Sequence, residues 1–207
     1  RLQIKDVPKD IGTILQYPVI ALDTQMLANM SPGALVTSWS DFTGYNSPVL
    51  NATTYNTNSN YIIPPYVSLT NNGTLASVTT GQYLDAGSKT FNVNTNGGFT
   101  AIWYGAFFNT GAANQHERIF DFGNGQNVDN ILAYRPGTGT AMGFYMHNGG
   151  TQYFVVSGSG VIIQNEWAVW TFRYTASSRL MEILKNGVSL VTGIAGAAIT
   201  DKTLTRT

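Results

Sequence analysis

From Gly98 onward the sequence is a succession of short apolar stretches separated by segments rich in Gly and Asn, and this spacing constrains the fold more than any other feature. Short strands with turn signals between them are typical of an all-β sandwich or barrel. The chain has 207 residues, a length that suits one sizeable hydrophobic core. We therefore expect an all-β fold in which antiparallel sheets pack as a β-sandwich.

Two hairpins can be placed from their turn residues. Asn186-Gly187 accepts positive φ at both central positions of a type I′ turn, which predicts strands over 180–185 and 188–191. The cluster Asn148-Gly149-Gly150 predicts a second hairpin between 143–147 and 151–156.

Two longer strands are predicted from their apolar patterns. Residues 99–108 are apolar on both faces of a strand, so we expect them to be buried between layers. Residues 167–175 alternate more cleanly, with Trp170, Phe172 and Tyr174 on one face and polar residues on the other.

The first third of the chain differs from the rest. Residues 29–80 are dense in Asn, Thr, Ser and Pro, which predicts surface loops and short edge strands. Residues 20–30 are the one helix candidate, with Asp23 or Thr24 as its cap. We interpret residues 1–17 as a linker or N-terminal arm and 18–207 as one domain.

Composition excludes several classes of function. Charged residues make up 11% of the chain and the formal net charge is zero, whereas a typical soluble domain carries about 25% charged residues. No basic cluster marks a nucleic-acid or anionic-membrane surface, and no apolar run approaches the ~20 residues of a membrane-spanning helix. The absence of Cys excludes disulfides, thiolate zinc sites and cysteine nucleophiles.

The segment RIFDFGNGQNVDNI, residues 118–131, could be a metal site, a catalytic pair or a turn. An EF-hand needs oxygen ligands at its third and fifth positions, but counting from Asp121 these are Gly123 and Gly125. A dinucleotide-binding G-x-G-x-x-G motif that starts at Gly123 also fails, because Val128 occupies the position of its last glycine. We favour a turn between strands over 119–122 and 131–134, and keep calcium held by Asp121 and Asp129 as the alternative; no other cofactor is expected.

The sequence shows no recognisable set of catalytic residues, so we assign no catalytic residue and expect a non-enzymatic protein. A retaining glycosidase needs two carboxyl groups about 5 Å apart, yet no Asp or Glu stands two residues from another in any predicted strand. His116 and His147 have no recognisable nucleophile partner, and no G-x-S-x-G elbow is present. The alternative is a polysaccharide hydrolase or lyase whose carboxylates, Asp121 or Glu166 among them, meet across strands.

Aromatic residues make up 12% of the chain and are the remaining candidates for binding a ligand. Most should lie in the core, but Tyr beside Asn, Asp and Gly would also suit sugar rings. The candidate ligand-binding residues are Tyr104, Asp121, Tyr145, His147 and Tyr153. Sequons at Asn29, Asn51 and Asn72 are candidates for glycosylation on a secretory route.

Several stretches resemble the laminin G-like, concanavalin A-like jelly-roll superfamily. They include GALVTSWSDFTGYN, GGFTAIWYGAF, RIFDFGNG and NEWAVWTFRYTASSRLMEILKNGV, and the resemblance extends from about residue 20 to the end. The Asn/Thr-rich front and the missing cysteines also resemble virion surface or minor capsid proteins of large algal viruses.

The resemblance implies a concanavalin A-like jelly roll that binds glycans or other protein subunits as part of a larger extracellular, cell-surface or virion assembly. It supplies no set of binding residues for this sequence. Family members usually continue past the NG hairpin into a strand that closes the sheet, so we expect these 207 residues to end before the last strand of the domain.

Overall fold

The computed structural model describes residues 88–108, 116–125 and 128–205, together with the backbone of four earlier strands. All elements in these residues are β-strands, and they pair antiparallel, which confirms the predicted all-β class. None of the described residues forms a helix long and apolar enough to cross a membrane. The earlier strands form one sheet in which β2 pairs with the other three: β1 (Leu35–Ser38), β2 (Val49–Asn56), β3 (Tyr66–Ser68) and β4 (Tyr83–Asp85).

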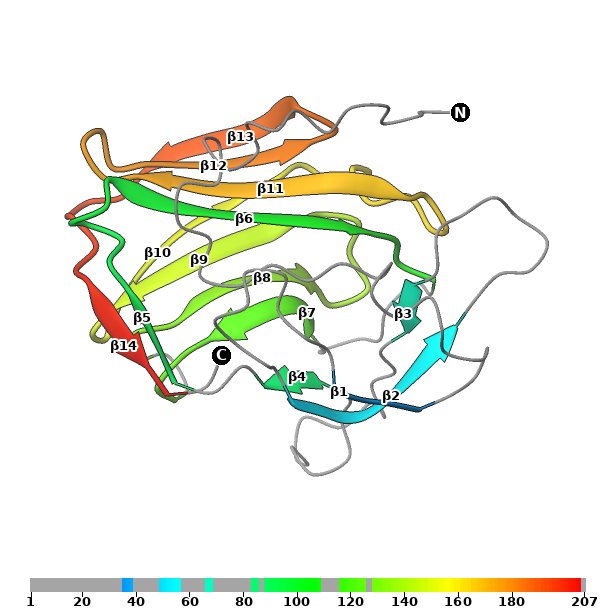
Figure 1. Ribbon diagram of the computed structural model, residues 1–207. Helices are drawn as coiled ribbons and strands as arrows, with labels where there is room; N and C mark the ends of the chain where they lie inside the picture. The colour runs from blue at the N-terminus through cyan, green and yellow to red at the C-terminus, as the bar shows by residue number, and fades with distance from the viewer. Residues whose placement is uncertain are drawn as a thin grey trace, which may run out of the picture.

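Two four-stranded sheets form the body of the described structure (Figure 1). The upper sheet has the order β13-β12-β11-β6 and consists of β6 (Gly98–Gly105), β11 (Ala168–Thr175), β12 (Leu180–Lys185) and β13 (Val188–Ile194). The lower sheet has the order β10-β9-β8-β7 and consists of β7 (His116–Phe122), β8 (Ile131–Pro136), β9 (Gly143–Asn148) and β10 (Thr151–Val156). The two sheets pack against each other as in a β-sandwich.

The core lies between these sheets and is dominated by aromatic rings. Phe172 of β11 contacts Phe120 of β7 and Phe144 of β9, with ring centroids 5.5 and 5.9 Å apart. Phe144 also stacks on Phe99 of β6 at 6.3 Å. Because large aromatic side chains bury the most apolar area per residue, these contacts stabilise the packing of one sheet on the other.

The strand β11 shows how the sequence pattern produces this core. Trp170, Phe172 and Tyr174 are only 2, 0 and 1% exposed, whereas Arg173 points outward and is paired with Glu182 of β12. The predicted alternation is therefore confirmed, and it follows from the period of two along a strand.

Both predicted hairpins are confirmed. Asn186 and Gly187 have φ of 51° and 80°, as a type I′ turn requires, and they join β12 to β13. The second turn pairs Asn148 with Thr151, so Gly149 and Gly150 are its central residues. The predicted antiparallel pairing on either side of the 123–130 segment is also found, between β7 and β8.

The prediction that 99–108 is buried on both faces is wrong. Ile102 and Tyr104 of β6 are 63 and 52% exposed. The upper sheet packs on the lower sheet with one face only, so Phe99, Ala101 and Trp103 of β6 meet the core and the alternate residues face outward. An apolar run on both faces does not by itself show that both faces are covered.

A third, short pair of strands closes one end of the core. β14 (Lys202–Leu204) pairs with β5 (Lys89–Phe91), at the left of Figure 1. Leu204 is fully buried, and Phe91 stacks on Phe122 at 5.2 Å. The residues after the NG hairpin thus return to the core and pair with a segment more than one hundred positions earlier. That the domain ends before its last strand stays a prediction.

Several predictions lie outside the described residues. These are the arm at 1–17, the helix at 20–30 and the sequons at Asn29 and Asn72. Asn51 lies on β2, of which only the backbone is described.

Truncating one aromatic side chain of the core tests how much that side chain contributes to stability. We expect Phe144→Ala to lower the free energy of unfolding by about 3–5 kcal/mol, because Phe144 is fully buried between two other rings. Urea denaturation would measure it. Val188→Ala is the control: Val188 is 66% exposed and should change stability by less than about 0.5 kcal/mol. A loss as small as the control's for Phe144→Ala would contradict this core.

Candidate functional site

The outer face of the lower sheet brings aromatic and polar side chains together. Ile131 and Ala133 of β8 are fully buried in the core, so Leu132 and Tyr134 point to the opposite face. The register then places one residue from each of the four strands side by side on this face. These residues are Asp121, Leu132, Tyr145 and Phe154.

Three rings on this face stack in succession. Tyr134 and Tyr145 lie 4.7 Å apart with planes 18° from parallel, and Tyr145 and Phe154 lie 5.1 Å apart at 15°. We call these three residues the aromatic row. Tyr145 is 9% exposed but Phe154 is 55% exposed, so the row is accessible at its Phe154 end.

Gly143 leaves the space that the ring of Tyr145, the middle ring of the row, occupies. Gly143 lies opposite Tyr134 in the register, and a Cβ atom at Gly143 would come 2.5 Å from Cε2 of Tyr145. The ring of Tyr145 therefore leans over Gly143 toward Tyr134. Burial raises the pKa of Tyr145, and its hydrogen bond with Tyr134 raises it further, so the phenol stays protonated at neutral pH.

Charged groups flank the row along β7. A bulge between Arg118 and Phe120 precedes Asp121, and Arg118 Nη1 lies 2.7 Å from Asp121 Oδ2. Asn130 Nδ2 donates to Asp121 Oδ1 at 2.9 Å. Arg118 keeps 51% of its side chain exposed beside the stack, so its unused N–H groups face solvent.

His147 is the most buried polar group of this face, at 3% exposure. Its Nδ1 has no hydrogen-bond partner among the described residues. Burial lowers the pKa of His147 and the charge of Lys202 adds to this, while Asp121 and Asp129 act in the opposite direction. The imidazole is therefore neutral at pH 7.

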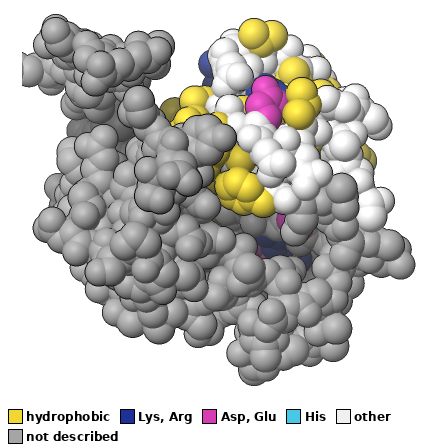
Figure 2. Space-filling model, turned by 90° about the vertical axis from the view of Figure 1, so that its right-hand side faces the viewer, with side chains coloured by type: hydrophobic (Ala, Val, Ile, Leu, Met, Phe, Trp, Pro, Cys, Tyr) yellow, Lys and Arg dark blue, Asp and Glu magenta, His cyan; other side chains and the backbone are white. Residues whose placement is uncertain are grey.

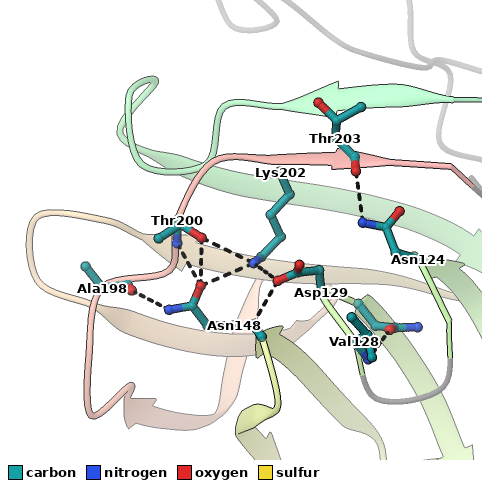
Figure 3. A network of polar contacts seen from close by, with 10 residues as sticks. Asn124, Val128, Asp129, Asn148, Ala198, Thr200, Lys202 and Thr203 are labelled. Carbon is teal, nitrogen blue, oxygen red and sulfur yellow. Dashed lines mark hydrogen bonds and ion pairs between the residues drawn. The ribbon is translucent and has the colours of Figure 1, made fainter.

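A polar network fixes the end of the sheet next to His147 (Figure 3). Lys202 Nζ of β14 lies 2.6 Å from Asp129 Oδ1, which also accepts the N–H of Gly149 at 2.8 Å. Asn148 Oδ1 accepts from Thr200 and lies 3.3 Å from Lys202 Nζ. The network ties the segment before β8, the β9–β10 turn and β14 to one another.

Three of the five predicted ligand-binding residues share this face, namely Asp121, Tyr145 and His147. Tyr153 packs against the core on the other face of the sheet. Tyr104 lies on the outer face of the upper sheet, 52% exposed and 5.3 Å from the ring of Trp167. The five residues therefore do not form one site.

Sequence reasoning missed Tyr134, Phe154 and Arg118. The signal for Phe154 was available, because a two-residue turn after Asn148 sets Tyr145 opposite Phe154. No comparable short-range signal places Tyr134 beside Tyr145, since their pairing depends on the longer connection between β8 and β9.

A second group of rings lies at one end of the upper sheet. Tyr104, Phe108 and Trp167 pack together, and Ile163 is 57% exposed in the same loop region as Trp167. We call these four residues the end patch. Figure 2 views the molecule from this end and shows hydrophobic side chains gathered on its described part.

The carboxylates of the described region are all engaged. Five pair with an arginine or lysine: Glu117 with Arg135, Asp121 with Arg118, Asp129 with Lys202, Glu166 with Lys185 and Glu182 with Arg173. The sixth, Asp201, accepts hydrogen bonds from Thr95 and from the backbone of Asn94. Hydrogen bonds lower the pKa of Asp129, Glu182 and Asp201, so each of these carboxylates is ionised at neutral pH.

Asp121 is paired with Arg118, and Asp129 is paired with Lys202. Within residues 88–108, 117–125 and 128–205, no group of three or more His, Asp or Glu side chains is placed to hold a metal. Between the two strands, the N–H of Asn124 donates to the carbonyl of Val128 at 3.3 Å and the N–H of Val128 donates to Asn130 Oδ1 at 3.1 Å, and Asp129 has a φ of 50°.

Calcium should therefore leave the melting temperature unchanged. A cation that bound the native state would raise it, in proportion to the logarithm of its concentration above the dissociation constant. Differential scanning fluorimetry with millimolar calcium and then with chelator measures the effect. A reversible rise that is lost in Asp121→Asn or Asp129→Asn would show that calcium binds there.

The buried imidazole predicts a pH dependence of stability. Because the pKa of His147 is lowered in the folded state, the unfolded state binds a proton more readily. The free energy of unfolding should decline as pH falls through about 6.5, the pKa of an exposed histidine. His147→Gln should reduce this decline between pH 7 and pH 5 in urea titrations. His116→Gln, which changes the other histidine of the chain, is the control; an identical slope in wild type and His147→Gln would contradict the prediction.

Comparison of the chain with known protein families, with curated proteins and with solved structures found no match. The resemblance to laminin G-like domains therefore stays a prediction. What the described residues establish is an all-β structure with packed antiparallel sheets and an aromatic row on one outer face.

Proposed function

We propose that the chain is a non-enzymatic binding module with a concanavalin A-like jelly-roll fold, and that the aromatic row binds a glycan. The observation that carries the proposal is the stack of Tyr134, Tyr145 and Phe154 beside Arg118 and Asp121. A sugar ring offers flat C–H faces and a rim of hydroxyl groups. Such a ligand needs apolar planes flanked by planar hydrogen-bonding groups.

The exposed end of the row supplies both kinds of contact. Phe154 offers an open ring, and Gln152, exposed on the same face of β10, carries an amide that can donate and accept. Arg118 adds free N–H donors at the Tyr134 end. The buried Tyr145 holds the rings in line, so that little side-chain freedom is lost on binding.

A non-enzymatic role is supported by the carboxylates. Glycoside hydrolysis depends on a paired acid and base, and each described carboxylate is instead held by a cation or by hydroxyl and backbone donors. Asp121 is paired with Arg118, and Glu166 lies with Lys185 at the opposite end of the sandwich.

Assembly with other protein subunits is a second candidate, favoured by the end patch. Tyr104, Phe108 and Ile163 are each about half exposed or more, and aromatic residues are enriched in the centres of protein interfaces. In either role the chain would belong to a larger extracellular, cell-surface or virion protein, as the resemblance to laminin G-like domains and virion proteins implies.

The two surfaces can be separated by matched substitutions. We expect Phe154→Ala to weaken binding to a glycan identified on an array about tenfold, because it removes the accessible ring of the row. Tyr104→Ala, which removes a ring of similar exposure on the other sheet, should leave glycan affinity unchanged. Isothermal titration calorimetry measures both.

The reverse outcome would contradict the proposed site. If Tyr104→Ala abolished glycan binding and Phe154→Ala did not, the end patch would be the glycan site. If the array gave no glycan and Tyr104→Ala disrupted a complex with another protein, the assembly role would replace the glycan role.

A further inference from the structure

Lys202 is a buried lysine whose amine meets a side-chain amide. Its side chain is 2% exposed, although lysine is seldom buried without a specific partner. Nζ lies 2.6 Å from Asp129 Oδ1, 3.3 Å from Asn148 Oδ1 and 3.4 Å from Thr200 Oγ1 (Figure 3). A nucleophile, a carboxylate and a carboxamide are thus gathered at one point.

The amide of Asn148 is held from both sides. Its Oδ1 accepts from the hydroxyl of Thr200 at 2.7 Å and from the N–H of Thr200 at 3.3 Å. Its Nδ2 donates to the carbonyl of Ala198 at 3.2 Å. The donors of Thr200 draw electron density toward Oδ1, so they would stabilise negative charge that develops there.

We propose that Lys202 and Asn148 form an intramolecular isopeptide bond, with Asp129 as the acid–base group and Thr200 as the oxyanion donor. The reaction is an amide exchange and needs no oxidant, reductant or cofactor. It goes beyond the proposed binding function, because it concerns a covalent link between β14 and β9 and not a ligand.

The step balances within these residues. Asp129 takes a proton from the Lys202 ammonium, and the freed lone pair on Nζ attacks Cγ of Asn148. Charge collects on Oδ1 beside the Thr200 donors. The Cγ–Nδ2 bond then breaks, and Nδ2 leaves with the protons released from Nζ as an ammonium ion, while Asp129 returns to its carboxylate form. One ammonium side chain and one carboxamide become one secondary amide and one free ammonium.

The arrangement favours this step in three ways. Nζ is already within 3.3 Å of Oδ1, the atom bonded to Cγ, so little movement brings it to attack. The carboxylate of Asp129 lies 2.6 Å from Nζ, within reach of the proton that must be removed. The half-buried Asn148 leaves a path by which ammonium can escape to solvent.

The bond would have a clear structural effect. It would join two positions 54 residues apart, in a chain that has no cysteine for a disulfide. A covalent link of this kind restricts the unfolded chain. It would also anchor β14, which pairs over only three residues with β5.

Intact-mass spectrometry of the purified full chain tests the proposal. The wild type should weigh less than its sequence mass by one ammonia, and a digest should contain a branched peptide linking Lys202 to Asn148. Lys202→Arg keeps the positive charge beside Asp129 but removes the nucleophile, so it should show the full sequence mass. Asn148→Ala should also show its full mass. Asp129→Ala should form the link about 10²–10⁴ times more slowly, the usual contribution of an acid–base group.

Two controls separate this chemistry from unspecific loss of ammonia. Lys185 is also largely buried and paired with a carboxylate, but its Nζ contacts Glu166 and the carbonyl of Val161 and not a carboxamide. Asn124 donates to Thr203 and accepts from Thr205, without a lysine in its network. Lys185→Arg and Asn124→Ala should each retain the mass loss of the wild type.

A stability measurement gives a second readout. If the link forms, Lys202→Arg should melt about 10 °C below the wild type, the shift expected for losing a cross-link over a loop of this size. A wild-type chain of unreduced mass with no branched peptide would overturn the proposal. A mass loss that persists in Lys202→Arg, or that maps to other residues, would overturn it as well.

Discussion

The contact of Phe172 with Phe120 and Phe144 is the interaction on which the described structure depends. These rings belong to β11, β7 and β9, so their packing holds one of the two central strands of the upper sheet against the lower sheet. A sheet with only one face packed on a partner is free to present different chemistry on the other. The aromatic row can exist on the outer face because the core face of the same strands is already filled.

The two faces of the lower sheet use aromatic rings in different ways. On the core face Phe144 is fully buried and meets rings of the opposite sheet. On the outer face the rings stack along the sheet, strand to strand, and the last of them, Phe154, is open to solvent. Stacking that ends in an exposed ring stabilises the sheet only in part, which is why we interpret it as a surface for recognition.

The low content of charged residues means that electrostatic interactions in this chain come from a few individual ion pairs. With 11% charged residues, few charges are available, and the described region contains five ion pairs. Pairs at a surface contribute little to stability, but a pair around a buried lysine fixes geometry at a cost in desolvation. The pair of Lys202 with Asp129 is of the second kind, and it connects the C-terminal strand to the turn segments beside His147.

The sequence by itself determined the all-β class, the two hairpins and the alternation of β11, because these depend on residues close together in the chain. The chemistry of Asn186-Gly187 sets a turn, and the period of two then sets which residues share a face. The sequence alone could not decide which face of β9 meets the core. Phe144 and Met146 alternate with Tyr145 and His147, so both faces are acceptable in a core.

Only the tertiary structure decided that face, and with it the aromatic row and the correction at β6. It also brought together groups that are distant along the chain, such as Lys202 with Asn148 and Asp129, and β14 with β5. Such contacts depend on the layering of the sheets and on the return path of the chain after β13. No local pattern specifies these distances, since propensity and periodicity act over a few residues and the contacts span more than fifty.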